Sequence, residues 1–280
     1  YAAARLQIAG YHKAGQDWAA AANLWEQVRD MKGATDDQRA EARAHLAEAY
    51  EKLGRHDDAE QVVNSVAAGG SDGPVIRFQR AKLRLRDAGA ALSGVVDDLE
   101  AALAGPDPKA VPAAEARAVC EEAFQKAKAA GDFALAVRAA TIFARVADGG
   151  AEHRLLADAH AGWAAAATGD EAKEHFRAAA TACEAAGKGD PTPAGKGDWL
   201  RKAAGLYLKA GDRAKGLAVL GDLTTRLTEY PDDKAGQAWA EMGDAYVAAG
   251  DPGQARLAFQ NAAARPGPAQ DRARVRCAAL

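Results

Sequence analysis

WAEMGDAYVAAGDPGQARLAFQNA, residues 239–262, contains the clearest copy of a pattern that recurs along the chain. Its key positions have successive spacings of one, three, four, five, four and three, at Met242, Gly243, Tyr246, Gly250, Ala255, Phe259 and Ala262. Residues 43–66 repeat the same spacings without a gap, at Leu46, Ala47, Tyr50, Gly54, Ala59, Val63 and Val66. A third copy runs through Ala203, Ala204, Tyr207, Gly211, Gly216, Leu220 and Leu223. A fixed spacing that recurs in this way indicates an internal structural repeat.

Each copy predicts two helices joined by a tight turn. The first three positions share one face of a helix with 3.6 residues per turn, and the small second residue lets another helix approach closely. Glycine then ends the first helix, because it accepts the left-handed conformation of a C-terminal cap. The remaining positions place a second helix antiparallel against the first. Since each pair keeps an apolar face that only another pair can cover, the pattern predicts a stacked array.

This spacing resembles that of the tetratricopeptide repeat (TPR), with about seven repeats over nearly the whole chain. The resemblance implies an all-α fold, a right-handed α-solenoid of helix-turn-helix repeats. We expect one array over residues 1–268, with repeats near 3–31, 36–68, 74–104, 112–147, 151–186, 198–228 and 234–265. Residues 269–280 are expected to form a capping helix or the start of a truncated repeat.

Composition argues against several classes of protein. Roughly a quarter of the residues are alanine, which favours close-packed helices over sheets. The formal charge of -3 provides no excess positive potential, so we do not expect nucleic acid as a partner. The three cysteines lie far apart without a C-x-x-C pair, and they predict neither a disulfide framework nor a zinc site.

The sequence also carries no signal for membrane insertion. No uncharged apolar run is long enough to span a bilayer, and no basic-then-apolar leader opens the chain. We therefore expect no membrane partner and a cytoplasmic location, or a periplasmic one if an upstream leader has been removed.

Two local patterns resemble ligand sites but lack essential parts. Lys196 follows a glycine, yet Gly197 stands where a phosphate-binding loop needs Ser or Thr, and no strand precedes it. His153 and His160 share a helix face without the three or four converging ligands that a metal requires. No nucleophile motif or dinucleotide-binding glycine pattern occurs either. We expect no enzymatic activity, no cofactor and no metal.

Residues 187–198 contain Gly-Lys-Gly-Asp twice around Pro191 and Pro193. This Gly and Pro content predicts a mobile loop between the fifth and sixth repeats, with Asp198 as the N-cap of a helix that begins at Trp199. Because such a loop buries little surface, we expect it to be the first site of limited proteolysis.

In the resembled family, first helices line a concave groove that binds extended peptides or partner helices. By helical phase, the corresponding residues here are Glu41, Glu48, Glu51, Gln79, Arg86, Glu121, Gln125, Lys128, Arg154, Arg201, Leu208, Lys209 and Asp244. Family members that bind chaperone tails use a Lys/Asn/Arg carboxylate clamp, and the second repeat presents Glu41, Glu48 and Glu51 instead. Tails of Hsp70 or Hsp90 are therefore not expected as ligands.

The resemblance implies a scaffold or adaptor that binds partner peptides or helices through this groove. One alternative is a sensing or regulatory segment of a larger bacterial signalling enzyme whose catalytic domain lies outside the chain. Another is an array that self-associates. Sequence beyond Tyr1 or Leu280 would separate the first two hypotheses, and sedimentation of the isolated chain would test the third.

Overall fold

The computed structural model describes residues 1–68, 73–87, 89–104, 111–147, 150–225 and 230–280. The chain divides into two compact units, Tyr1–Ala127 and Lys128–Leu280. Within the described ranges the regular structure is entirely helical, which confirms the all-α prediction. None of the helices found there is long and apolar enough to cross a bilayer.

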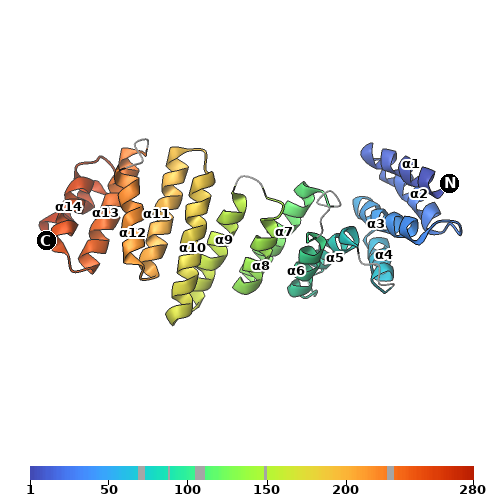
Figure 1. Ribbon diagram of the computed structural model, residues 1–280, viewed down its shortest axis with the longest axis horizontal. Helices are drawn as coiled ribbons and strands as arrows, with labels where there is room; N and C mark the ends of the chain where they lie inside the picture. Colours follow the sequence, from blue (N-terminus) through green and yellow to red (C-terminus); the bar gives the residue numbers. More distant parts are fainter. Residues whose placement is uncertain (69–72, 88, 105–110, 148–149, 226–229) are drawn as a thin grey trace. The chain divides into compact units, whose positions relative to one another are not determined.

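Unit 1 consists of successive antiparallel helix pairs followed by most of one further helix (Figure 1). In chain order its helices are α1 (Ala2–Ala14), α2 (Trp18–Arg29), α3 (Asp36–Lys52), α4 (His56–Ala68), α5 (Pro74–Arg86), α6 (Leu92–Ala102) and α7 (Ala113–Ala129). The second helices α2 and α4 also contact the first helix of the next pair, α3 and α5 respectively. This contact covers the apolar face that an isolated pair would expose.

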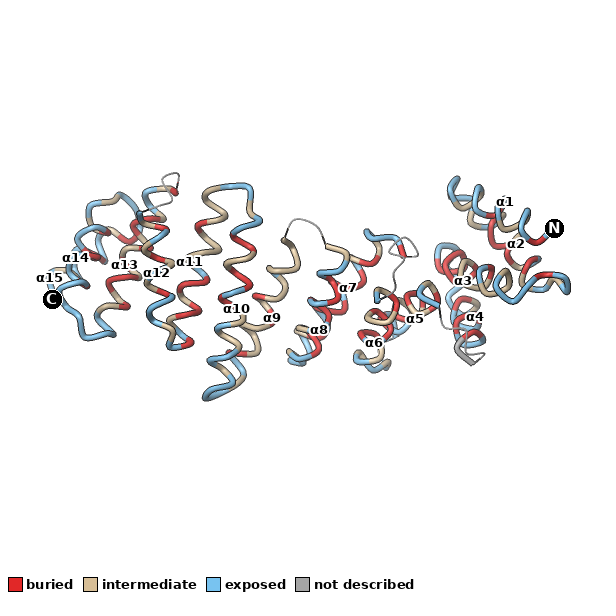
Figure 2. Tube along the Cα trace, viewed as in Figure 1, coloured by how far each residue is buried: buried red, intermediate tan, exposed pale blue. Residues whose placement is uncertain are grey.

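Unit 2 continues the same arrangement. Its helices are α8 (Phe133–Phe143), α9 (Ala151–Ala166), α10 (Gly169–Gly189), α11 (Pro193–Lys209), α12 (Arg213–Thr225), α13 (Asp232–Ala248), α14 (Pro252–Ala263) and α15 (Gln270–Ala278). The last helix, α15, packs on α14 in the place that the first helix of a further pair would take. Figure 2 shows the buried residues along the helix faces that meet one another within each unit.

The repeat positions have the roles that their spacing predicts. Gly54, Gly211 and Gly250 adopt positive φ angles of 73°, 81° and 74° at the turns between paired helices. At the small position of the last pair, a Cβ on Gly243 would lie 2.6 Å from the ring of Phe259. Glycine therefore permits the close approach of α13 and α14 that the pattern requires.

The predicted loop at residues 187–198 is wrong. α10 extends to Gly189 and α11 begins at Pro193, so only Asp190–Thr192 separate the two helices. The N-cap of α11 is Thr192, whose hydroxyl oxygen accepts a hydrogen bond from the backbone N–H of Gly195 at 3.1 Å. Asp198 lies inside α11 and does not cap it.

The glycines of this segment serve close packing. A Cβ on Gly187 would lie 3.2 Å from Cβ of Trp199, and one on Gly197 would overlap the ring of Tyr230. Both glycines are buried within helices, so their backbone hydrogen bonds are made. The expectation of preferred proteolysis depended on a long exposed loop, and only a short turn around Pro191 and Thr192 is exposed outside the helices.

Candidate functional site

The residues predicted to line the groove occupy three different settings. Three are buried: Glu48, Glu51 and Gln79. Four are partly buried: Lys128, Arg201, Leu208 and Asp244. The others are exposed: Glu41, Arg86, Glu121, Gln125, Arg154 and Lys209.

In unit 1, two of the predicted carboxylates join neighbouring first helices. Nζ of Lys13 on α1 lies 2.6 Å from Oε2 of Glu48 on α3, and Arg86 on α5 pairs with Glu51 on α3. Burial acts to raise the pKa of Glu48, but hydrogen bonds from His45 and Lys13 hold it below its ordinary value. Because these carboxylates are buried and paired, we leave them out of the candidate binding surface.

The first helices of unit 2 are joined in the same way. Arg201 on α11 pairs with Glu241 on α13 at 2.8 Å. Asp244 on α13 pairs with two arginines of α15, Arg272 at 2.6 Å and Arg276 at 2.7 Å. These pairs are partly exposed, so each contributes little to stability.

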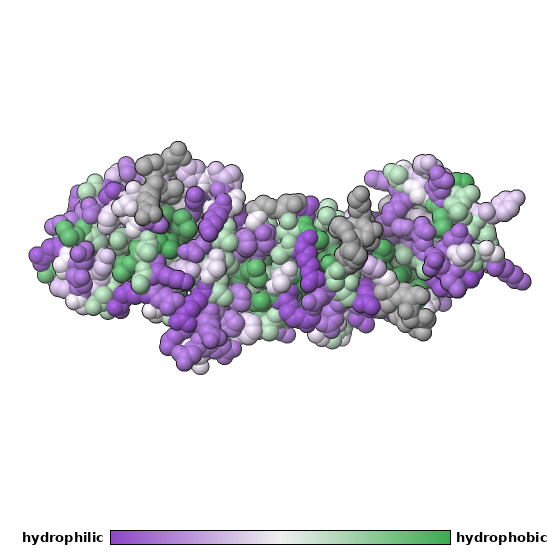
Figure 3. Space-filling view, in the orientation of Figure 1, coloured by the Kyte–Doolittle hydropathy of each residue, from purple (hydrophilic) through white to green (hydrophobic). Residues whose placement is uncertain are grey.

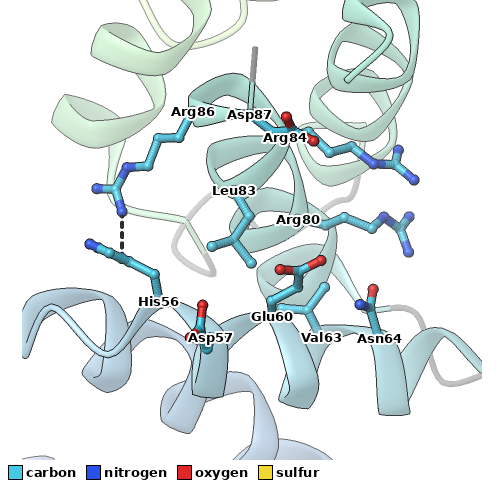
Figure 4. Close-up of a pocket in the computed structure, with 10 residues that line it drawn as sticks. All are labelled: His56, Asp57, Glu60, Val63, Asn64, Arg80, Leu83, Arg84, Arg86 and Asp87. Carbon is cyan, nitrogen blue, oxygen red and sulfur yellow. Dashed lines mark hydrogen bonds between the residues drawn. The ribbon is translucent and has the colours of Figure 1, made fainter. Parts of the chain in front are cut away.

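A hollow of about 340 Å³ lies between α4 and α5 in unit 1 (Figure 4). Its basic residues are already engaged: the guanidinium groups of Arg80 and Arg84 contact the buried carboxylate of Asp98 at 2.9 and 2.7 Å. Arg86 lies 3.0 Å from Nδ1 of His56, as Figure 4 shows. An anionic ligand would compete with Asp98, so we regard this hollow as a junction between repeats. Its full lining is His56, Asp57, Glu60, Val63, Asn64, Arg80, Leu83, Arg84, Arg86 and Asp87.

Two adjoining hollows of about 370 and 240 Å³ lie over α11 and α13 in unit 2, and both include Glu241 and Asp244. We call their combined surface the α11–α13 groove. The first is lined by Gly205, Leu208, Gly211, Arg213, Glu241, Asp244, Ala245 and Ala248. The second is lined by Arg201, Gln237, Ala240, Glu241, Asp244, Pro268, Ala269 and Arg272. The groove thus brings together three predicted residues: Arg201, Leu208 and Asp244.

The floor of the groove is apolar and its rim is charged. A Cβ on Gly205 would meet nothing within 4 Å, so this mid-helix glycine leaves the floor open. Burial raises the pKa of Glu241, despite the attraction of the nearby Arg201. On the face of unit 2 that Figure 3 shows, apolar patches likewise alternate with hydrophilic side chains.

Several residues that line the groove were not identified from helical phase. Glu241 lies three residues before Asp244 and so on the same helix face, which spacing alone could have indicated. Gly205 offered a different signal, because a glycine inside a helix lowers helix stability and so suggests a role in packing or binding. Arg213 and Ala248 come from the ends of helices, and only the packing of α11 against α13 places them at the groove.

Three aromatic rings form a stack in the fifth repeat of the chain. The ring centroid of His175 on α10 lies 3.8 Å from that of Trp163 on α9 and 5.3 Å from that of His160 on α9. Nδ1 of His160 lies 3.1 Å from Nδ1 of His175. This distance is that of a hydrogen bond between the two rings, so each Nδ1 already has a partner. In the ranges that the structure describes, no group of three or more His, Cys, Asp or Glu is placed to bind a metal.

The stack is expected to make stability depend on pH. Burial, aided by the charge of His175, lowers the pKa of His160 below its ordinary value of 6.5. The folded protein therefore binds this proton less readily than the unfolded chain, and stability is lost as the pH falls below about 6.5. Urea denaturation at about pH 7.5 and pH 5 should show a smaller difference in His160→Leu than in the wild type. His153→Gln, on the same helix, should behave as the wild type. An unchanged pH difference in His160→Leu would contradict the assignment.

Residues 13–91 match the family model described as tetratricopeptide repeat. No protein with curated annotation matches the chain. Among solved structures, the chain is similar to a tetratricopeptide repeat protein from Parabacteroides merdae, with 12% identity, a TM-score of 0.42, and coverage of 99% of this chain and 97% of that one. It is also similar to the C-terminal part of a TPR repeat-containing protein from Cytophaga hutchinsonii, with 12% identity, a TM-score of 0.46, and coverage of 97% and 98%.

A signal transduction ATPase with a tetratricopeptide repeat sensor, from Pyrococcus horikoshii, has 14% identity and a TM-score of 0.39. That similarity covers 92% of this chain and 41% of the ATPase. The family match therefore identifies tetratricopeptide repeats in residues 13–91, and antiparallel helix pairs continue beyond that segment.

Proposed function

We propose that this chain is a scaffold or adaptor that holds a peptide or helix of a partner protein in the α11–α13 groove. Tetratricopeptide-repeat proteins generally mediate protein–protein interactions. The observation that carries the proposal is the open, apolar floor between the charged residues of the first helices in unit 2. In this part of unit 2, residues that were chosen by helical phase line a hollow.

The groove offers a partner both apolar contact surface and charged groups that can confer specificity. Gly205, Leu208 and Ala245 provide apolar surface, and the small residues among them let a peptide backbone approach closely. Glu241 and Arg213 add charges of both signs beside this surface. Rim charges of this kind contribute to specificity and to the rate of association more than to affinity. The arrangement supports a segment of mixed charge with one or two apolar anchors.

The exposed residues chosen by helical phase remain predictions as further contacts in each unit: Glu41, Arg86, Glu121, Gln125, Arg154 and Lys209. A regulatory segment of a larger signalling enzyme would use the same groove, with partner binding coupled to the activity of that enzyme. Self-association of the array also remains a hypothesis for sedimentation to test.

Gly205→Trp should fill the groove with an indole ring and block binding. The probes are peptides selected from a random library for binding to the wild-type chain, with affinity measured by fluorescence polarisation. Gly205→Trp should weaken them by at least about tenfold, a loss of about 1.4 kcal/mol. Gly221→Trp is the matched control, because Gly221 on α12 is also a helical glycine with nothing within 4 Å of its Cβ position. It should leave affinity unchanged.

Both variants should fold, since removing a glycine from a helix interior costs no helix stability. Circular dichroism and urea denaturation would verify this before binding is compared. Selected peptides that bind Gly205→Trp as tightly as the wild type would show that the groove is not the binding site.

A further inference from the structure

A third hollow in unit 2, of about 460 Å³, lies at the turns of the fourth and fifth repeats, and its lining shares no residue with the groove. We call it the turn-edge hollow. One side comes from the turn before α8 and the start of that helix, and the other from the end of α9 and the start of α10. Its lining is Gly131, Asp132, Phe133, Ala134, Trp163, Ala166, Ala167 and Glu171.

The two aromatic walls of the hollow are held in place by their surroundings. The Trp163 ring stacks on His175, and its Nε1–H donates a hydrogen bond to Oε1 of Glu171 at 3.1 Å. The Phe133 ring packs against Gly162, where a Cβ would lie 2.5 Å from Cε1 of the ring. Because these rings are already ordered, a ligand would not have to immobilise them on binding.

Both charged side chains that line the hollow are acidic, Asp132 and Glu171. The nearest basic residues of α10 have other partners: Lys173 pairs with Asp170 at 2.8 Å, and Arg177 pairs with Asp212 at 2.8 Å. An aromatic wall attracts a cation through the negative face of its ring, and a carboxylate attracts it directly. The hollow therefore complements a positively charged group.

We propose that the turn-edge hollow binds an arginine side chain presented by a partner protein. A planar guanidinium can stack on Trp163 and donate paired N–H groups to the carboxylate of Glu171, whereas an ammonium is a compact, strongly hydrated charge. The walls of Trp163 and Phe133 leave room for the methylene stem of the arginine. This site is separate from the α11–α13 groove, so it gives the scaffold a second contact that does not depend on the first.

The test uses the full chain, labelled with ¹⁵N, and two short synthetic peptides. One is acetyl-Gly-Ser-Arg-Ser-Gly-amide, and the other carries citrulline, the neutral isostere of arginine, at the same place. The signal to follow is the indole N–H of Trp163, assigned by its loss in Trp163→Phe. The arginine peptide should shift this signal in a saturable way. The citrulline peptide should bind at least about tenfold more weakly, because it lacks the charge that both ring and carboxylate recognise.

Glu171→Gln separates the charge of the hollow from its shape, since the amide oxygen can still accept the indole hydrogen bond. This variant should weaken the arginine peptide by at least about fivefold. Glu174→Gln removes an exposed charge on the same helix that does not line the hollow, and affinity should stay within about twofold of the wild type. Equal affinity for the two peptides, or equal effects of the two variants, would overturn the proposal.

Gly205→Trp distinguishes this site from the proposed groove. The variant should leave the response of Trp163 to the arginine peptide unchanged. Loss of that response in Gly205→Trp would place the peptide in the groove and overturn the assignment to the hollow.

Discussion

Replacing Phe259 by alanine is expected to lower the free energy of unfolding by about 3–5 kcal/mol, the cost of truncating a fully buried aromatic side chain. Phe259 has 0% of its surface exposed and lies where α14 meets α13. Its ring fits over Gly243, so the neighbouring backbone cannot simply fill the space that the ring leaves. Urea denaturation followed by circular dichroism would measure the loss.

Leu257→Ala is the matched control for this prediction. Leu257 lies two residues away on the same helix, but 54% of its surface is exposed, so the change should cost less than about 1 kcal/mol. A double variant tests the packing more directly. Gly243→Ala alone should destabilise, because its Cβ would lie 2.6 Å from the Phe259 ring, but in the Phe259→Ala background it should be neutral or stabilising. Additive effects of the two changes would mean that the ring and Gly243 are not in contact.

Asp98→Ala should lower the free energy of unfolding by about 3 kcal/mol, because it removes a buried carboxylate that two arginines contact. Only 7% of the Asp98 side chain is exposed, and it lies 2.9 Å from Nε of Arg80 and 2.7 Å from Nη1 of Arg84. These contacts join α5 to α6, the two helices of the third repeat. Chemical denaturation of the full chain would show the loss as a lower midpoint with little change in slope.

Two further variants separate the ion pair from other effects of the substitution. Glu60→Ala removes an exposed carboxylate from α4 in the same unit and should change stability by no more than about 0.5 kcal/mol. Arg80→Met combined with Asp98→Leu replaces the carboxylate and one of its two arginine partners by apolar groups, and it should be less destabilising than Asp98→Ala alone. If Asp98→Ala costs no more than Glu60→Ala, solvent screens the contact and its burial contributes nothing.

Local spacing was sufficient to predict the helix pairs. Gly54, Gly211 and Gly250 end their helices through a preference for positive φ that belongs to the residue itself, so no knowledge of distant residues was needed. The same holds for the face on which Tyr207 and Leu220 are buried, since helical phase follows from the 3.6-residue period.

Composition gives the wrong prediction at residues 187–198, because a glycine has the same sequence signal whether it belongs to a flexible loop or lets two helices pack closely. Gly187 lies against Trp199, and Gly197 lies against Tyr230, which is more than thirty residues further along the chain. Only the packed structure shows these neighbours. The helix signal was present, in Thr192 followed by Pro193, but the glycines that follow obscured it.

The same distinction between local sequence signals and long-range packing applies to the candidate site. Helical phase alone places Arg201, Leu208 and Asp244 on one face of their first helices, because that is a property of each helix alone. The packing between helices establishes which charged residues remain available to a ligand, since Glu48 is neutralised by Lys13, 35 residues away, and Asp244 pairs with Arg272 of α15. Pairing between stacked helices depends on their distance and side-chain conformations, and neither is contained in the period of a single helix.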